Sequence, residues 1–242
     1  GGVASSCIQK NIVQHNGYAL FYDTDIFFSY GVKTAEDILN LGARINHLHP
    51  VGSFAMGNSS FKPDTHSINN KIDILYIGIN VVTSDKTDWS GYYQSVNWLA
   101  ELARKNKHLH IAIKHHPSWT SDEKEFAIIQ GSGIKYLDKN IDSYEVANQS
   151  TYIITFGSSM GYELTGYNFN VIFIDPGHDN PFINNFVHKD KNVIHEYKDL
   201  EFLVNDQTNF EQKKNKIKNI NYCYPNQEIS RSIHKYLVTC KP

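Results

Sequence analysis

Short runs of apolar and β-branched residues alternate along the chain with segments whose apolar residues recur at helical spacing. The run at residues 72–77 is typical of a strand buried on both faces, and residues 92–105 place Val96, Leu99 and Ala103 on one helical face. The other predicted strands are residues 26–31, 47–51, 109–114, 134–137, 152–156 and 171–174. This alternation predicts an α/β fold, with a parallel sheet that has helices on both faces.

The segment 54–71 interrupts this pattern, because it lacks apolar periodicity and is rich in Gly, Asn, Ser and Pro. We therefore expect a linker over residues 58–71, between a first unit at 1–57 and a main domain at 72–200. Residues 1–57 hold too few elements for a doubly wound domain, so we expect them to be the end portion of a larger one. Residues 201–242 are expected to form C-terminal helices, mainly over 209–236.

The composition excludes some kinds of partner. A net charge of -2 over 242 residues gives no reason to expect a nucleic acid or an anionic membrane surface. Cys7, Cys223 and Cys240 are far apart and fit no metal-ligand spacing, so we expect reduced thiols in a cytoplasmic protein. No apolar run is long enough for a membrane span, and the first residues do not resemble a signal peptide.

The sharpest chemical signal is Gly157-Ser158-Ser159, between a predicted strand and a predicted helix. Such a turn lets the backbone approach an anion, and the helix start offers free N–H groups beside the two hydroxyls. The alternative is a serine that only caps the helix. Glu163 follows in the helix and is a candidate for binding ribose hydroxyls, or else an ordinary surface residue.

A second signal is Lys114-His115-His116-Pro117, at the end of another predicted strand. Adjacent residues of a strand point to opposite faces, so only one of the two histidines is expected to reach a ligand. Histidine donates to a phosphate or a base, and proline fixes the loop. A metal site is not predicted, because no third ligand lies at a typical spacing.

The turn Gln14-His15-Asn16-Gly17 ends a predicted strand in the first segment. His15 is a candidate general base in a cleft, and its alternative is a histidine held by the turn's own hydrogen bonds. Asp175-Pro176-Gly177 follows the last predicted strand and is interpreted as a turn.

These motifs together resemble the C-terminal domain of bacterial surface-polysaccharide glycosyltransferases of the GT-B type. The similarity lies in residues 114–117, 142–145, 153–163 and 171–175, and it is strongest to capsule Kdo transferases, bacterial sialyltransferases and CDP-glycerol glycerophosphotransferases. The resemblance implies that His116 and Pro117 contact a cytidine nucleotide and that the hydroxyls of Ser158 and Ser159 bind its phosphate. Gly157 is a candidate for the same phosphate site because its turn lets the backbone approach an anion. It also implies that 72–200 is a Rossmann-like nucleotide-sugar domain, that 1–57 ends an acceptor domain, and that the last helix packs back on 1–57.

The expected function is thus transfer of a sugar from a CMP- or CDP-linked donor to a glycan or lipid-linked acceptor, without a metal or other cofactor. The protein is expected in the cytoplasm, and peripheral association with the inner face of the cell membrane stays open. Two alternatives remain on the same scaffold: a non-hydrolysing UDP-sugar 2-epimerase, and a nucleotide-binding module without catalysis. Fold by itself does not choose among them.

Overall fold

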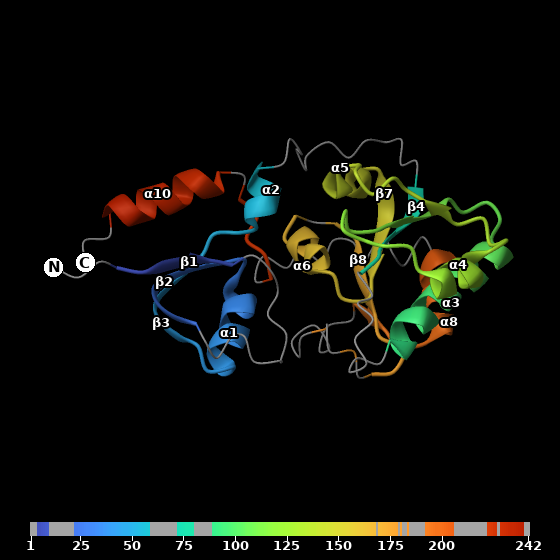
Figure 1. The fold of residues 1–242 in the computed structure, drawn as a ribbon, viewed down its shortest axis with the longest axis horizontal. Helices are drawn as coiled ribbons and strands as arrows, with labels where there is room; N and C mark the ends of the chain where they lie inside the picture. Colours follow the sequence, from blue (N-terminus) through green and yellow to red (C-terminus); the bar gives the residue numbers. More distant parts are fainter. Residues whose placement is uncertain are drawn as a thin grey trace. The chain divides into compact units, whose positions relative to one another are not determined.

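The computed structural model describes residues 4–9, 22–58, 72–79, 89–167, 169–178, 180, 183, 192–205, 222–226 and 228–239. Contacts divide the chain into two compact units (Figure 1). Unit 1 consists of Gly1–Lys62, Tyr162–Phe169 and Ile217–Pro242, and unit 2 of Pro63–Gly161 and Asn170–Lys216. Each unit has its own parallel sheet. No helix in these described ranges is long and apolar enough to cross a bilayer.

Unit 1 contains a three-stranded parallel sheet in the order β1-β2-β3. The central strand β2 is the most buried of the three, and Phe27 packs with Ile38 of the first helix on one face. On the other face Phe28 packs with Val51 and Ile229. The elements are β1 (Ser6–Ile8), β2 (Asp23–Ser29), α1 (Val32–Asn40), β3 (Arg44–Pro50), α2 (Phe54–Asn58) and α10 (Ile229–Thr239).

The C-terminal helix α10 packs on the first segment, as expected. Tyr236 meets the rings of Phe28 and His49 at centroid distances of 5.8 and 3.5 Å. The expected helix over 209–236 is confirmed only from Ile229 onward, because residues 222–226 are not helical. Residues 209–221 lie outside the described part of the chain.

Unit 2 contains a six-stranded sheet in the order β6-β5-β4-β7-β8-β9, with every pair parallel. Numbered within the unit, this order is 3-2-1-4-5-6, the doubly wound order of dinucleotide-binding domains. The parallel sheet predicted from the sequence is therefore confirmed. Its strands are β4 (Ile72–Ile77), β5 (Ile111–Lys114), β6 (Lys135–Tyr136), β7 (Ser150–Thr155), β8 (Val171–Ile174) and β9 (Val193–Ile194).

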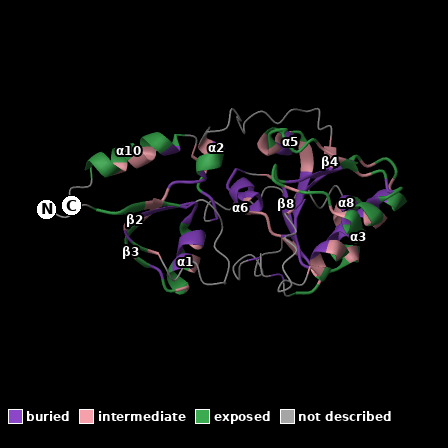
Figure 2. Cartoon of the chain, in the orientation of Figure 1, coloured by how far each residue is buried: buried purple, intermediate pink, exposed green. Residues whose placement is uncertain are grey.

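Helices cover both faces of this sheet, and its strands are buried (Figures 1 and 2). Alternate strand residues such as Ile74, Tyr76 and Ile154 pack with the helices α3 and α8, while their neighbours Leu75 and Ile153 are buried on the other face. Burial on both faces explains why these strands have continuous apolar sequences. The helices of unit 2 are α3 (Ser90–Lys105), α4 (Glu123–Ile129), α5 (Ser143–Asn148) and α8 (Tyr197–Asn205). The helix α6 (Ser159–Thr165) starts in unit 2 and continues in unit 1 from Tyr162.

The structure differs from the sequence expectations in three short elements. Phe54–Asn58 forms the helix α2, although the sequence suggested that an irregular segment begins at residue 54. The strands β1 and β9 were not predicted, and they have three and two residues. Segments this short hold less than two periods of a strand or helix, so their apolar pattern carries little information.

Candidate functional site

The predicted site residues of unit 2 lie at the carboxyl edge of one sheet. Strands β5 and β7 both pair in parallel with β4, so His116 after β5 and Ser158 after β7 follow strand ends on the same edge. Adjacent strands lie about 4.8 Å apart, which puts β5 and β7 about 10 Å from each other. The strand order reverses between β4 and β7, and open α/β sheets bind ligands at such a switch point.

The loop Gly157–Ser159 is held by a threonine that the sequence analysis missed. Thr155 Oγ1 accepts hydrogen bonds from the N–H groups of Gly157 at 3.2 Å and Ser158 at 2.9 Å. The same hydroxyl donates to the carbonyl of Ile77 at 3.2 Å, which ties the ends of β7 and β4 together. The free backbone N–H groups expected for an anion are thus partly engaged. A hydroxyl residue two positions before a Gly-Ser turn was the available signal.

The two serine hydroxyls are the remaining polar groups of this loop. Ser158 Oγ accepts from the N–H of Met160 at 3.3 Å, so this serine does cap α6. A hydroxyl that accepts a hydrogen bond still has its own proton to donate. Ser159 is half-buried, and its hydroxyl makes no hydrogen bond within the described residues. Both hydroxyls are therefore able to donate to an incoming anion.

The segment after β5 forms a tight turn that fixes the tautomer of His116. The N–H of Trp119 donates to the carbonyl of His116 at 2.8 Å, and the N–H of Ser118 donates to His116 Nδ1 at 3.1 Å. Ser118 Oγ also lies 2.6 Å from this Nδ1. Because a backbone N–H can only donate, Nδ1 is the acceptor in this turn, which assigns the ring proton to Nε2. His116 and Pro117 are exposed, so this Nε2–H is free to meet a ligand.

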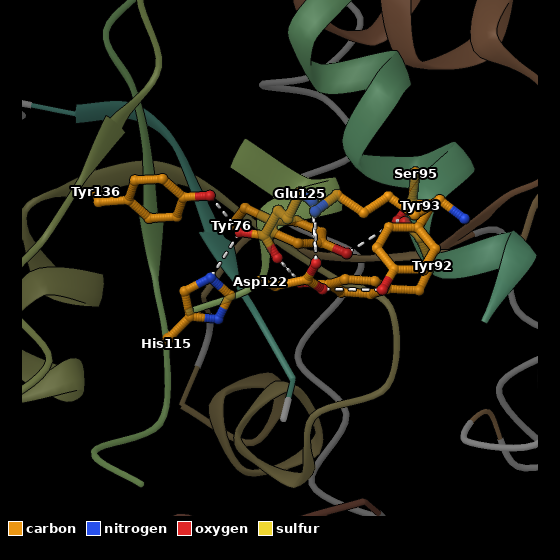
Figure 3. A network of polar contacts seen from close by, with 9 residues as sticks. Tyr76, Tyr92, Tyr93, Ser95, His115, Asp122, Glu125 and Tyr136 are labelled. Atoms are coloured by element: carbon orange, nitrogen blue, oxygen red, sulfur yellow. Dashed lines mark hydrogen bonds and ion pairs between the residues drawn. The ribbon is translucent and has the colours of Figure 1, made fainter. Parts of the chain in front are cut away.

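His115 is buried instead, and it belongs to a polar network around Glu125 (Figure 3). The carboxylate of Glu125 accepts hydrogen bonds from Tyr92 Oη at 2.5 Å, Tyr136 Oη at 2.7 Å and His115 Nε2 at 2.8 Å. Burial by itself would raise the pKa of the Glu125 carboxyl, but the hydrogen bonds from His115, Tyr92 and Tyr136 lower it below its ordinary value. Glu125 is therefore a buried carboxylate.

Lys114 is a buried cation beside this network. Its Nζ donates to the carbonyls of His115 at 2.8 Å and Lys139 at 2.9 Å, which joins the loops after β5 and β6. Desolvation lowers the pKa of the Lys114 ammonium, against the opposing effect of Asp138 and Asp142. The His115–Pro117 segment is thus held from two sides by buried charged groups.

The lowered pKa of Glu125 predicts a contribution to acid stability. A carboxyl whose pKa is lower in the folded state stabilises the fold above its ordinary pKa, and this is lost as the pH falls through the folded value. Between about pH 5 and about pH 3, wild-type protein should lose more stability than the variant Glu125→Gln. Urea unfolding across this range tests it. Glu123→Gln, an exposed change on the same helix, should follow the wild type, and equal pH slopes for all three proteins would contradict the prediction.

Glu163 lies in unit 1 and is only 4% exposed, so the interpretation as a surface residue is wrong. Its carboxylate accepts hydrogen bonds from Ser53 Oγ at 2.5 Å and Tyr30 Oη at 3.5 Å. Burial, with the nearby Glu163 charge, raises the pKa of the Tyr30 phenol well above its ordinary value. Inside unit 1, Glu163 thus accepts hydrogen bonds from Ser53 and Tyr30. Its contact with a ribose stays a prediction.

Two other sequence interpretations have different outcomes. His15 lies outside the described residues, so its role as a general base stays a prediction. The turn after β8 is confirmed, since the carbonyl of Asp175 accepts from the N–H of His178 at 3.3 Å. Within the ranges that the structure describes, no group of three or more His, Cys, Asp or Glu side chains is arranged to hold a metal ion.

Comparisons with known proteins identify the fold. No protein-family model and no curated protein sequence matches the chain. Among solved structures, it is similar to the UDP-GlcNAc 2-epimerase of Neisseria meningitidis bound to UDP-GlcNAc (TM-score 0.65, 11% identity, 97% of this chain and 70% of that one). It is also similar to S. aureus MnaA in complex with UDP (TM-score 0.63, 13% identity, 99% and 70%).

A third similar structure is the wall teichoic acid polymerase TagF soaked with CDPG (TM-score 0.50, 14% identity, 89% of this chain and 56% of that one). Together with the strand order, these similarities show that the chain has an α/β fold of the GT-B type, with a Rossmann-like parallel sheet. The similar structures have more than one activity in their names, since they include UDP-GlcNAc 2-epimerases and a wall teichoic acid polymerase.

Proposed function

We propose that the chain is the nucleotide-binding part of a metal-independent glycosyltransferase for surface-polysaccharide synthesis, with a CMP- or CDP-linked donor. The observation that carries the proposal is the pair of donor groups at one sheet edge: His116 Nε2–H after β5, and the Ser158 and Ser159 hydroxyls after β7. The preference for cytidine rests on the resemblance of these motifs to capsule Kdo transferases, bacterial sialyltransferases and CDP-glycerol glycerophosphotransferases.

In this function the leaving phosphate accumulates negative charge as the bond to the anomeric carbon breaks. Hydrogen-bond donors that are already in position stabilise such charge without having to reorganise. The hydroxyls of Ser158 and Ser159 and the imidazole N–H of His116 are assigned this role, while Pro117 and Gly157 shape the two loops. His15 is assigned the general base, and Glu163 a ribose contact.

A second candidate is supported by the structural similarity itself. The TM-scores are higher for the two proteins of the UDP complexes than for the polymerase soaked with CDPG, which favours a UDP-sugar 2-epimerase scaffold. Both functions need a nucleoside diphosphate or monophosphate at the same sheet edge. They differ in the base, because the first expects cytidine and the second uridine.

A thermal-shift comparison of CMP, CDP, UDP and GDP is the test. A ligand that binds only the folded state raises the melting temperature in proportion to the logarithm of its concentration over Kd. We expect CMP or CDP at about 100 times Kd to stabilise the protein by about 2.7 kcal/mol, and UDP and GDP to have smaller effects. A rise in melting temperature with UDP alone would contradict the transferase with a cytidine-linked donor and would support the epimerase. No response to any of the four would contradict both.

A further inference from the structure

Glu125, in α4, is hydrogen-bonded to His115, the residue directly before His116, yet neither Glu125 nor His115 is exposed enough to meet a ligand directly. Glu125 is 0% exposed and His115 is 3% exposed. A buried carboxylate costs several kcal/mol in desolvation, and apolar side chains of similar size would often pack at lower cost. The network therefore calls for a reason other than stability of the core.

The ring of His115 is restrained on three sides. Its Nε2 is hydrogen-bonded to Glu125 at 2.8 Å, and its face stacks on Trp119 at a centroid distance of 4.1 Å and an interplanar angle of 2°. On the third side it lies against Gly78, where an added Cβ would come within 2.2 Å of His115 Nδ1. The imidazole is thus fixed in one orientation.

The same stack restrains the turn that carries His116. Trp119 closes this turn by donating its N–H to the carbonyl of His116 at 2.8 Å, and its indole rests on the fixed ring of His115. Figure 3 shows how His115, directly after β5, and Tyr136, in β6, converge on Glu125. The position of the His116 imidazole therefore depends on Glu125 through two intermediates, His115 and Trp119.

We propose that Glu125 is a positioning residue of the nucleotide site: through His115 and Trp119 it holds the His116–Trp119 turn in the conformation that presents His116 Nε2–H to a phosphate. The inference rests on the proposed function, since the phosphate is the ligand assigned there. Glu125 itself does not touch the ligand. Groups that orient a ligand-binding side chain in this way have effects on affinity that are larger than their effects on the fold.

The test compares Glu125→Gln with Asp122→Ala. Gln keeps the size of Glu125 but loses the charge that holds His115. Asp122 caps α4 through the N–H groups of Lys124 and Glu125 and binds Tyr93, so its loss weakens the same helix without breaking the bond to His115. Glu125→Gln should weaken CMP or CDP binding about tenfold, the usual cost of losing an orienting group, and Asp122→Ala should leave it within about twofold.

A ligand-free measurement separates this inference from the function on which it rests. In long-range ¹H–¹⁵N spectra, with His116 assigned by His116→Asn, the wild type should show a fixed Nε2–H tautomer of His116. Glu125→Gln should shift these signals toward a mixture of tautomers, and Asp122→Ala should not. If Glu125→Gln does not fold, His115→Gln, which keeps a donor toward Glu125 but loses the stack, should give the same shift.

Unchanged His116 signals in Glu125→Gln would overturn the inference, whatever the nucleotide data show. Equal loss of affinity in Glu125→Gln and Asp122→Ala would also overturn it, because helix stability would then explain both. If the wild-type protein binds none of the four nucleotides, the proposed function fails. The His116 spectra then decide the positioning role of Glu125 without a ligand.

Discussion

Replacing both Ser158 and Ser159 with alanine should weaken the binding of CMP or CDP by at least about tenfold, while unit 2 stays folded. Each hydrogen bond to a charged group contributes about 1.5–3 kcal/mol, so the loss of even one exceeds a factor of ten. The backbone N–H groups of Gly157 and Ser158 already bond to Thr155, so they offer little to replace the lost hydroxyls. Titration calorimetry with both nucleotides measures the effect.

The matched control for this double variant is Ser150→Ala. Ser150 lies at the start of the same strand, β7, and its hydroxyl donates to the carbonyl of Val146 at 2.7 Å, so it is at the opposite edge of the sheet. The Ser150→Ala variant should bind CMP and CDP with the affinity of the wild type. Because Ser158 also caps α6, the double variant should lose about 1 kcal/mol of stability. If the double variant binds CMP and CDP with wild-type affinity, the two hydroxyls are not part of the nucleotide site.

Gly78→Ala should lower the free energy of unfolding by about 3 kcal/mol, a large effect for one added methyl group. The new Cβ would come within 2.2 Å of His115 Nδ1 and 2.4 Å of its Cε1, and the ring is already held by its stack on Trp119 and its hydrogen bond to Glu125. Displacing it would break the bond to Glu125 and leave a buried carboxylate with one donor fewer. Chemical denaturation gives the size of the loss.

Gly91→Ala is the comparison for Gly78→Ala. There the nearest atoms to an added Cβ belong to the ring of Phe156 at 3.2 Å, and Gly91 is in α3, where alanine is favoured over glycine by up to about 1 kcal/mol. The free energy of unfolding of Gly91→Ala should stay within about 1 kcal/mol of the wild-type value. If Gly78→Ala is equally mild, the ring of His115 is less restrained than its contacts indicate.

The long strands of unit 2 were predictable from the sequence, because a strand buried on both faces must be apolar throughout. Residues 72–77 and 171–174 were predicted with the bounds that β4 and β8 have in the structure. The sequence also showed which loops follow the strands: His116-Pro117 and Gly157-Ser158-Ser159 carry residue types that suit an anion. Parallel strand order then puts both loops at one edge of the sheet, whatever the details of packing.

What only the tertiary structure decided is which of these groups is available to a ligand and which is engaged inside the protein. Strand alternation says that one of His115 and His116 faces inward, but the assignment depends on Glu125, ten residues further along the chain in α4. Glu163 is bonded to Ser53, which is 110 residues away. Such contacts are absent from local patterns, because a buried carboxylate is stable only where donors from distant segments meet around it.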